Sequence, residues 1–421
     1  QEVASAVRAA LAVEGGSALV FLPGVREIER TAERLRADLR ASNVDVRPLY
    51  GAMSPADQDA AIAPAPPGRR KVVLATAIAE SSLTVPGIRY VIDTGLARVK
   101  RYSHRNKIEQ VQVEPIARAA ANQRAGRCGR VSAGICFRLY AEDDFNRRDA
   151  YTEPEILRSS LAGVILRMKS LHLGDVENFP FIEAPTPRMI ADGYQLLAEL
   201  GAIDETTKEL TKVGVELAKL PLDPKIGRMI LAAREQGCLH EMLIIAAALS
   251  VQDPRERPQE QAGSADQAHA KWKDEKSEFL SYLKLWQAAD TVWRHESTNK
   301  QRQWCRQNFL SWLRVREWRD VHAQLLTLCH EHGWKISSAY SGAVAVTAPL
   351  AAVAKVTVEK KVGDGDTPRS KSTSRTAAQE AIAPVAPRFD SVNAYAAIHK
   401  ALLTGLLGHI GLKSVEEAHY L

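Results

Sequence analysis

Three arginines and one glutamine lie close together in residues 123–130, which read QRAGRCGR. The residues between them are small, so the backbone can come close to a ligand. Arginine carries a permanent charge and a planar fork of donors that suits phosphate oxygens. Arg127 and Arg130 lie three positions apart and would share one face of a helix. This spacing predicts a pair of arginine fingers that stabilise a phosphoryl group during its transfer. A basic, solvated helix start is the alternative.

Two apolar segments upstream are expected to position these side chains. Residues 71–74 (KVVL) and 89–93 (RYVID) are typical of buried parallel strands, and polar residues follow each of them. Open α/β sheets bind ligands beyond the carboxyl ends of their strands. Thr76 and Thr84 carry hydroxyl groups at strand or loop ends, where they suit phosphate contacts.

Residues 71–95 resemble motif V, and residues 123–130 resemble motif VI, of the DEAH/RHA helicases of superfamily 2. Residues 17–24 (SALVFLPG) and 48–54 (PLYGAMS) are similar to motifs IV and IVa of the same family. Other segments are similar to the bacterial HrpA-type branch, at residues 151–158, 249–258, 313–320 and 398–410. On this resemblance the chain is identified as the second half of the motor core of an HrpA-like RNA helicase.

The resemblance implies an α/β domain with a RecA-like parallel sheet, then a winged-helix domain and an α-helical, ratchet-like bundle. We expect these domains at residues 1–150, 151–222 and 223–335. Strands alternate with helices in the first part and helices predominate in the last, as this order requires. Residues 336–390 are rich in Ala, Val, Lys, Ser, Thr and Pro and are predicted to be a disordered insertion. Residues 391–421 are expected to hold the last bundle helix and the approach to a truncated OB-like domain.

The nucleotide-facing residues follow from the resemblance. It implies that Gln123, Arg127 and Arg130 face the γ-phosphate of ATP, which is bound with Mg²⁺ mainly by a first RecA-like domain. Gly126 and Thr84 are expected to contribute to the nucleotide site. No phosphate loop of the form G-x-x-x-x-G-K-[ST] occurs in the chain. The string EEAH at residues 416–419 follows no apolar strand and is not taken as a DEAH box.

Two positions depart from the family pattern, and three more are assigned to structure. Ile62 stands where related proteins stack a phenylalanine on adenine, so base stacking is expected to be weaker. Ala77 stands where the family usually has asparagine. Arg124 is expected to be structural or to face nucleic acid. Glu80 and Asp93 are expected to be network residues rather than catalytic bases.

A predicted hairpin and a predicted helix carry the candidate RNA contacts. Alternation over residues 97–102 and 108–113 indicates a hairpin, with no acidic residue from 98 to 107. Its candidate contacts, together with Thr76, are Arg98, Lys100, Arg101, Arg105 and Lys107. An ordinary solvated hairpin is the alternative.

The predicted helix spans about residues 304–326 and interleaves arginine with tryptophan, a pattern that could stack and clamp single-stranded RNA. Tryptophans at helical spacing are more often core residues. Arg316 and Arg319 are therefore the preferred candidates on this helix for contact with RNA.

Composition agrees with a polyanionic partner. The 421 residues carry a net charge of +6 at a pI near 9.0. Five cysteines without a C-x-x-C pair favour a reduced, cytoplasmic protein and give no zinc pattern. No apolar run is long enough to span a membrane.

We therefore expect the intact protein to be a monomeric, ATP-dependent RNA helicase that acts on single-stranded or partly duplex RNA, with ribosome association left open. The chain alone is expected to lack ATPase activity and to retain weak, salt-sensitive RNA binding. The alternatives are a non-catalytic RNA-binding or ribosome-associated module, and a helicase acting on DNA or RNA–DNA hybrids.

Overall fold

The computed structural model describes residues 1–13, 15–40, 42–51, 53, 55–81, 83–103, 107–130, 132–258, 261–340 and 392–409. It divides into two compact units, Gln1–Leu196 and Leu197–Leu421, and each is described by itself. Arg105, residues 341–391 and the EEAH string at 416–419 lie outside the described residues.

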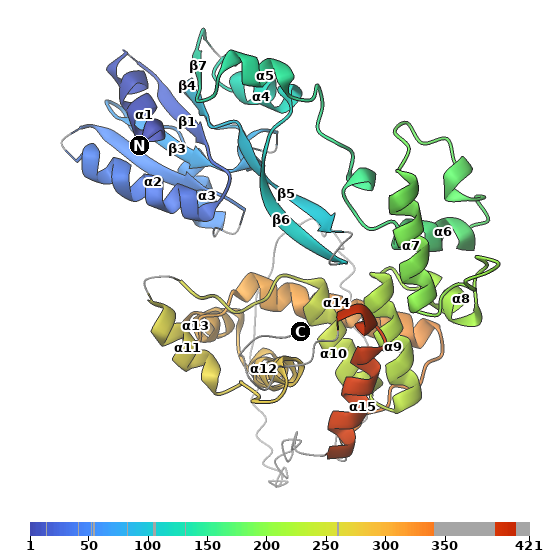
Figure 1. The fold of residues 1–421 in the computed structure, drawn as a ribbon. Helices are drawn as coiled ribbons and strands as arrows, with labels where there is room; N and C mark the ends of the chain where they lie inside the picture. Colours follow the sequence, from blue (N-terminus) through green and yellow to red (C-terminus); the bar gives the residue numbers. More distant parts are fainter. Residues whose placement is uncertain are drawn as a thin grey trace, which may run out of the picture. The chain divides into compact units, whose positions relative to one another are not determined.

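A five-stranded parallel sheet forms the centre of the first unit (Figure 1). Its order is β2-β3-β1-β4-β7, and every neighbouring pair is parallel. The strands are β1 (Ser17–Phe21), β2 (Val44–Leu49), β3 (Arg70–Ala75), β4 (Ile88–Asp93) and β7 (Ile135–Arg138). β1 is buried along its whole length, as expected of a strand covered on both faces. The predicted RecA-like parallel sheet is confirmed.

Each face of the sheet has its own apolar cluster. On one face, α1 (Glu2–Ala12) and α2 (Val25–Asp38) pack against β1, β3 and β4, with Ile28, Ala32 and Leu35 forming the buried stripe of α2. The other face is covered by α3 (Pro55–Ile62) and η1 (Ala77–Ala79). Lys71 of β3 is buried and donates hydrogen bonds to the carbonyl groups of Ala61 and Ala63, which fastens the end of α3.

A two-stranded antiparallel hairpin follows β4. It consists of β5 (Leu96–Ser103) and β6 (Ile108–Pro115) and confirms the predicted hairpin. The chain turns into β5 at Gly95, whose φ is +70°. A Cβ atom there would lie 2.6 Å from the ring of Tyr140, so both the backbone angle and the close approach require glycine. The remaining elements of the unit are α4 (Arg118–Ala125), α5 (Glu142–Arg147), η2 (Glu155–Leu157), α6 (Ala162–Ser170), η3 (Val176–Asn178) and most of α7 (Pro187–Glu199).

Helices make up almost all regular structure described in the second unit. They are α8 (Lys212–Ala218), α9 (Pro224–Gln236), α10 (Leu239–Ser250), α11 (Ala262–Ala270), α12 (Glu278–His295), α13 (Thr298–Gln307), α14 (Trp312–Glu331), α15 (Val392–Leu403) and η5 (Leu407–His409). α10 is buried on nearly every side and forms the centre of the bundle. The indole nitrogen of Trp318 donates a 2.9 Å hydrogen bond to the carbonyl of Ile244, which ties α14 to α10. α15 lies within residues 391–421, where the last bundle helix is expected, and it packs in the same apolar cluster as α10. None of the helices in the described ranges is long and apolar enough to span a bilayer.

The helix predicted over about 304–326 is wrong, because two helices occupy this region. α13 ends at Gln307, and Phe309 has a φ of +51°, which a continuous helix does not allow. The backbone of the break pairs with an earlier segment: Glu256 N donates to Phe309 O, and Ser311 N donates to Pro254 O. These bonds satisfy groups that would otherwise continue the helix. The bundle also continues to Tyr340, beyond the predicted boundary at 335, since Ser338 donates to the buried carboxylate of Glu241.

His322 on α14 predicts how the stability of the bundle depends on pH. Its ring is 8% exposed and lies 4.5 Å from that of Trp286, and its Nε2 has no partner among the described residues. Burial lowers its pKa from 6.5 to about 3, with smaller effects from His240, Arg319 and Asp290. Between these values the unfolded chain binds the proton and the folded chain does not. Stability is therefore complete above pH 6.5 and falls as the pH decreases.

Replacing His322 with leucine should remove this dependence. Between pH 6.5 and 5 the wild type should lose about 2 kcal/mol more stability than the variant, at about 1.4 kcal/mol per pH unit. All seven tryptophans lie within residues 272–334, so urea unfolding followed by tryptophan fluorescence reports on the bundle alone. Equal losses in the two proteins would contradict the prediction.

Candidate functional site

Arg127 and Arg130 lie in a turn rather than on a helix, so the expectation of a shared helical face is wrong. α4 ends at Ala125, and Gly126 donates the last helical hydrogen bond, to Asn122 O. The backbone then turns more tightly than an α-helix, because Arg127 N donates a hydrogen bond to Arg124 O and Cys128 N donates one to Ala125 O. Cys128 is 5% exposed and packs against the sheet beside Val85 and Ile88, which anchors the turn. Burial raises the pKa of this thiol, so it is a packing residue.

The turn brings two guanidinium groups together. Arg130 Nη1 donates a 2.5 Å hydrogen bond to Thr84 Oγ1. Arg127 Nη1 is buried and has no hydrogen-bond partner within the described part of the chain. Burial lowers the pKa of Arg127, the nearby charge of Arg130 lowers it further, and Glu80 partly offsets both. An anion between the two groups would relieve their repulsion and satisfy the unpaired donor.

The other predicted nucleotide residues are placed differently. Gln123 is exposed near the end of α4. Gly126 has a φ of −59°, and a Cβ atom there would make only ordinary contacts, so the fold itself does not require glycine. Ile62 is half-buried against the cluster under α3. Thr76 lies just after the carboxyl end of β3, whereas Cys128 of the arginine turn and Arg89, near the amino end of β4, both lie beside Gly134. Because both strands run parallel, Thr76 is at the opposite edge of the sheet from the turn.

Arg124 is the centre of a buried network, in agreement with its expected structural role. Its side chain is 1% exposed, and it donates to Glu80 at 2.6 Å and to Asp93 at 2.7 Å. It also donates to the carbonyl of Leu96, at the start of the hairpin, and lies over the ring of Phe21. Glu80 and Asp93 are therefore network residues, as predicted.

The same network extends to residues that the sequence analysis did not identify. Tyr140 donates a 2.8 Å hydrogen bond to the second oxygen of Asp93. Arg148 lies over the Tyr140 ring and donates to the carbonyls of Gly95, just before β5, and Ile116, just after β6, which lie together at the root of the hairpin. The root of the hairpin is thus held by the residue group that also holds motif V and α4. Neither Tyr140 nor Arg148 lies in a recognised motif, so no local signal marked them.

Three cations in the described part of the hairpin are paired with carboxylates. Lys100 contacts Glu109 at 2.5 Å, and Arg101 contacts Glu114 at 2.5 Å and Glu153 at 2.6 Å. Arg98 packs on Gly24 and lies 3.6 Å from Glu27, and Lys107 lies at the start of β6 with a φ of +51°. Lys100 is the most exposed of the three paired cations, at 68%, so its surface pair contributes little and can exchange for phosphate. Arg101 is instead a positioning residue that joins both strands to the segment after α5.

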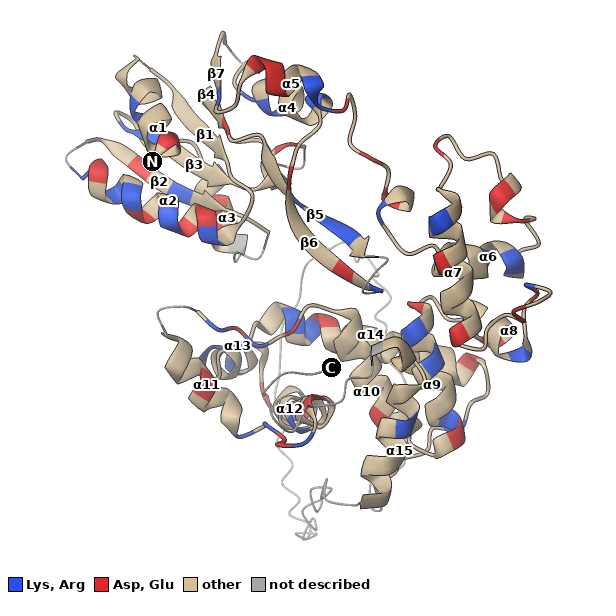
Figure 2. Cartoon of the chain, viewed as in Figure 1, with Lys and Arg blue, Asp and Glu red and all other residues tan. Residues whose placement is uncertain are grey.

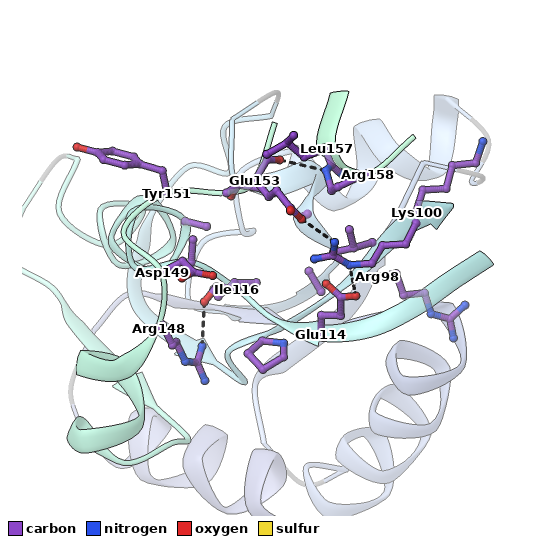
Figure 3. Close-up of a pocket in the computed structure, with 18 of the residues that line it drawn as sticks. Arg98, Lys100, Glu114, Ile116, Arg148, Asp149, Tyr151, Glu153, Leu157 and Arg158 are labelled. Carbon is purple, nitrogen blue, oxygen red and sulfur yellow. Dashed lines mark hydrogen bonds and ion pairs between the residues drawn. The ribbon is translucent and has the colours of Figure 1, made fainter. Parts of the chain in front are cut away.

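A cavity of about 1000 Å³ lies at the base of the hairpin (Figure 3). Ala77 and Glu80 of motif V line it, as do the hairpin and residues 144–158. Six basic and six acidic residues line its wall, including Arg101 between Glu114 and Glu153. This balance gives no net attraction for a polyanion inside the cavity.

In the bundle, the two predicted RNA contacts differ. Arg319 is 25% exposed, donates to Asp290 at 2.8 Å and lies over the rings of Trp286 and Trp293. Its guanidinium therefore holds α14 to α12 rather than extending into solvent. Arg316 is 59% exposed and lies 3.7 Å from Asp320, which leaves it accessible. Among the described residues no three His, Cys, Asp or Glu side chains are grouped as a metal site needs.

Comparison with known proteins places these elements in a family. Residues 2–132 match the helicase conserved C-terminal domain. Residues 194–222 match the winged-helix part, and residues 223–311 the ratchet-like part, of the helicase-associated domain HA2. A solved structure of the Escherichia coli DExH-box NTPase HrpB is similar over 59% of this chain and 30% of its own, with 39% identity and a TM-score of 0.56.

Two curated relatives are similar over nearly all of this chain. The HrpA homologue of Haemophilus influenzae, named as an ATP-dependent RNA helicase, is 43% identical over 98% of this chain and 28% of its own length. HrpA of Escherichia coli, named likewise, is 42% identical over 96% of this chain and 27% of its own. The chain thus spans less than a third of either relative. Because both relatives cover nearly all of this chain at more than 40% identity, and the helicase C-terminal and HA2 domains match in this chain, it belongs to the HrpA-like branch of the DEAH/RHA-type helicases of superfamily 2.

Proposed function

We propose that this chain is the second half of the motor core of an ATP-dependent RNA helicase. The observation that carries the proposal is the pair of arginines in the turn after α4, where Arg127 has a buried, unpaired Nη1 and a like charge beside it. A terminal phosphate of ATP would satisfy that nitrogen and relieve the repulsion.

In this proposal, residues of this chain bring positive charge to the γ-phosphate and hold the reacting groups in position. ATP with Mg²⁺ would bind mainly to a first RecA-like domain and supply the phosphoryl group. Arg127 and Arg130 would contact the γ-phosphate when the two RecA-like domains close, and Gln123 would hold the phosphate or the attacking water. Thr84 accepts a hydrogen bond from Arg130 and would keep that side chain near the turn until the phosphate arrives.

The proposed RNA path uses the hairpin and motif V. Lys100 is the best placed of the described hairpin cations, because its pair with Glu109 is exposed to solvent. Thr76 would contact the RNA backbone at the edge of the sheet opposite the arginine turn. The roles of Arg98, Lys107, Gly126 and Ile62 remain predictions, as do a monomeric state, cytoplasmic action and any association with ribosomes.

ATP hydrolysis tests the proposal directly. The complete protein that contains this chain should hydrolyse ATP faster when single-stranded RNA is added, whereas residues 1–421 alone should show no turnover, because they carry no phosphate loop. Single-stranded DNA of the same sequence is the control for nucleic-acid preference. Robust hydrolysis by the chain alone would contradict the division of the active site. A complete protein without ATPase activity would favour a non-catalytic RNA-binding module.

A further inference from the structure

α13 lies in a stretch of the bundle that carries several basic residues and no acidic residue. Residues 297–316, which span α13 and the start of α14, contain four arginines, one lysine and no Asp or Glu. α2, in contrast, alternates acidic and basic residues along its exposed surface (Figure 2). An exposed helix without neutralising partners produces a positive potential at its surface.

The α13 cations are largely free of acidic partners. Arg306 has no hydrogen-bond or ion-pair partner among the described residues, and Arg302 contacts only the ring of Trp312, at 4.6 Å. Arg316 approaches the same ring, at 5.8 Å. Lys300 and Arg316 are exceptions, since Lys300 lies 2.7 Å from Glu296 and Arg316 lies 3.7 Å from Asp320. Stacking on Trp312 orients the Arg302 fork and leaves its N–H groups open, which lowers the entropy lost when a phosphate binds.

One side of α13 is fixed and the other is open. Gln301 and Cys305 are buried, and Trp304 packs against Trp272 and Trp293, so the helix is held firmly in the bundle. The opposite side carries only polar side chains and lines a hollow of about 480 Å³, formed by Asn299, Arg302, Gln303, Arg306 and Gln307. Arg302 and Arg306 lie four positions apart, about 6 Å along the helix, where they can contact neighbouring phosphates of one strand.

We propose that this outer face of α13, formed by Asn299, Arg302, Gln303, Arg306 and Gln307, binds the phosphate backbone of single-stranded RNA. The proposal rests on the RNA-binding part of the proposed function. The absence of apolar side chains from the face argues against a protein partner, whose interface needs an apolar core. Arginine forks suit phosphates, and the three amide side chains can hydrogen-bond to sugars and base edges without sequence preference.

Charge reversal on α13 tests the proposal. We would measure binding of fluorescein-labelled oligo(U) to the 421-residue chain by anisotropy, for Arg302→Glu/Arg306→Glu and for the milder Arg302→Gln/Arg306→Gln. The matched control is Arg26→Glu/Arg30→Glu on α2, where two exposed arginines have the same spacing. Tryptophan fluorescence would verify that the bundle of each variant is folded.

The expected readout is the salt dependence of the dissociation constant. The slope of log K against log [salt] is negative, and loss of two phosphate contacts on a single strand makes it shallower by about 1.4. From 50 to 200 mM salt, wild-type affinity should therefore fall about sevenfold more than that of either α13 variant. The α2 control should keep the wild-type slope.

Any one of four results would overturn the inference. Both α13 variants could keep the wild-type slope, or the α2 control could lose as much slope as they do. Displacement of RNA by poly-glutamate at equal charge concentration would assign the face to acidic proteins instead. Absence of RNA binding by the wild-type chain would overturn both this inference and the RNA part of the proposed function, while leaving the arginine fingers to the ATPase test.

Discussion

Replacing Arg130 with alanine is expected to lower RNA-stimulated ATP hydrolysis by the complete protein by on the order of 10³-fold, the usual contribution of an arginine finger. Arg130 is exposed and its one described contact is to the Thr84 hydroxyl, so the substitution should leave the fold intact. The loss should appear in kcat, because the guanidinium acts on charge that develops in the transition state.

Three further proteins make this result specific. Arg130→Lys keeps the charge but not the fork and should recover only part of the rate. Arg30→Ala on α2 removes a similarly exposed arginine and should leave hydrolysis unchanged. Arg127→Ala should match Arg130→Ala if both contact the same phosphate. If Arg130→Ala hydrolyses ATP within twofold of the wild-type rate and still binds RNA, Arg130 is not an arginine finger.

Replacing Arg124 with alanine is expected to destabilise the first unit by about 3–5 kcal/mol, the usual cost of removing one partner of a buried ion pair. Asp93 is fully buried and Glu80 is 16% exposed, and both lose their bond to the same guanidinium. The carbonyl of Leu96 also loses a donor, so the root of the hairpin should loosen.

The distribution of tryptophans allows this effect to be localised. The first unit contains none, so hydrogen exchange of the β1 and β4 amides would report its stability, while tryptophan fluorescence follows the bundle as an internal control. Adding Asp93→Asn and Glu80→Gln to Arg124→Met should restore part of the loss, because no buried charge then remains unpaired. Unchanged protection of β1 and β4 in Arg124→Ala would contradict the structural role of the network.

Local pattern was sufficient for two strands of the sheet and for the hairpin. The predicted strands at 71–74 and 89–93 are β3 and β4, and the predicted hairpin is β5 with β6. These segments are recognisable because a strand buried on both faces needs a continuous apolar run, and a half-exposed hairpin needs alternation. Arg127 and Arg130 were singled out by their spacing and by the resemblance of residues 123–130 to motif VI, and they lie in a turn rather than on a helix.

Local sequence pattern could not predict which charged residues form ion pairs with residues far away in the chain. The stretch from 98 to 107 has no acid, yet Arg101 is neutralised by Glu114 across the hairpin and by Glu153 from a later segment. Arg319 was predicted for RNA, but its guanidinium is bonded to Asp290 on a neighbouring helix. A one-dimensional count of charges cannot tell a free cation from a paired one.

The chain's own residue order thus identified the family and most element types, and it predicts the chemistry of the arginine turn, since these depend on periodicity and on residue identity. The packed molecule established which cations are free: Arg130 and Arg306 present accessible donors, while Arg101, Arg124 and Arg319 are held by carboxylates. The physical reason is that the electrostatic state of a side chain depends on burial and on neighbours within a few ångströms. Those neighbours come from segments that only folding brings together, as when Asp93 and Arg124, 31 positions apart, form one buried pair.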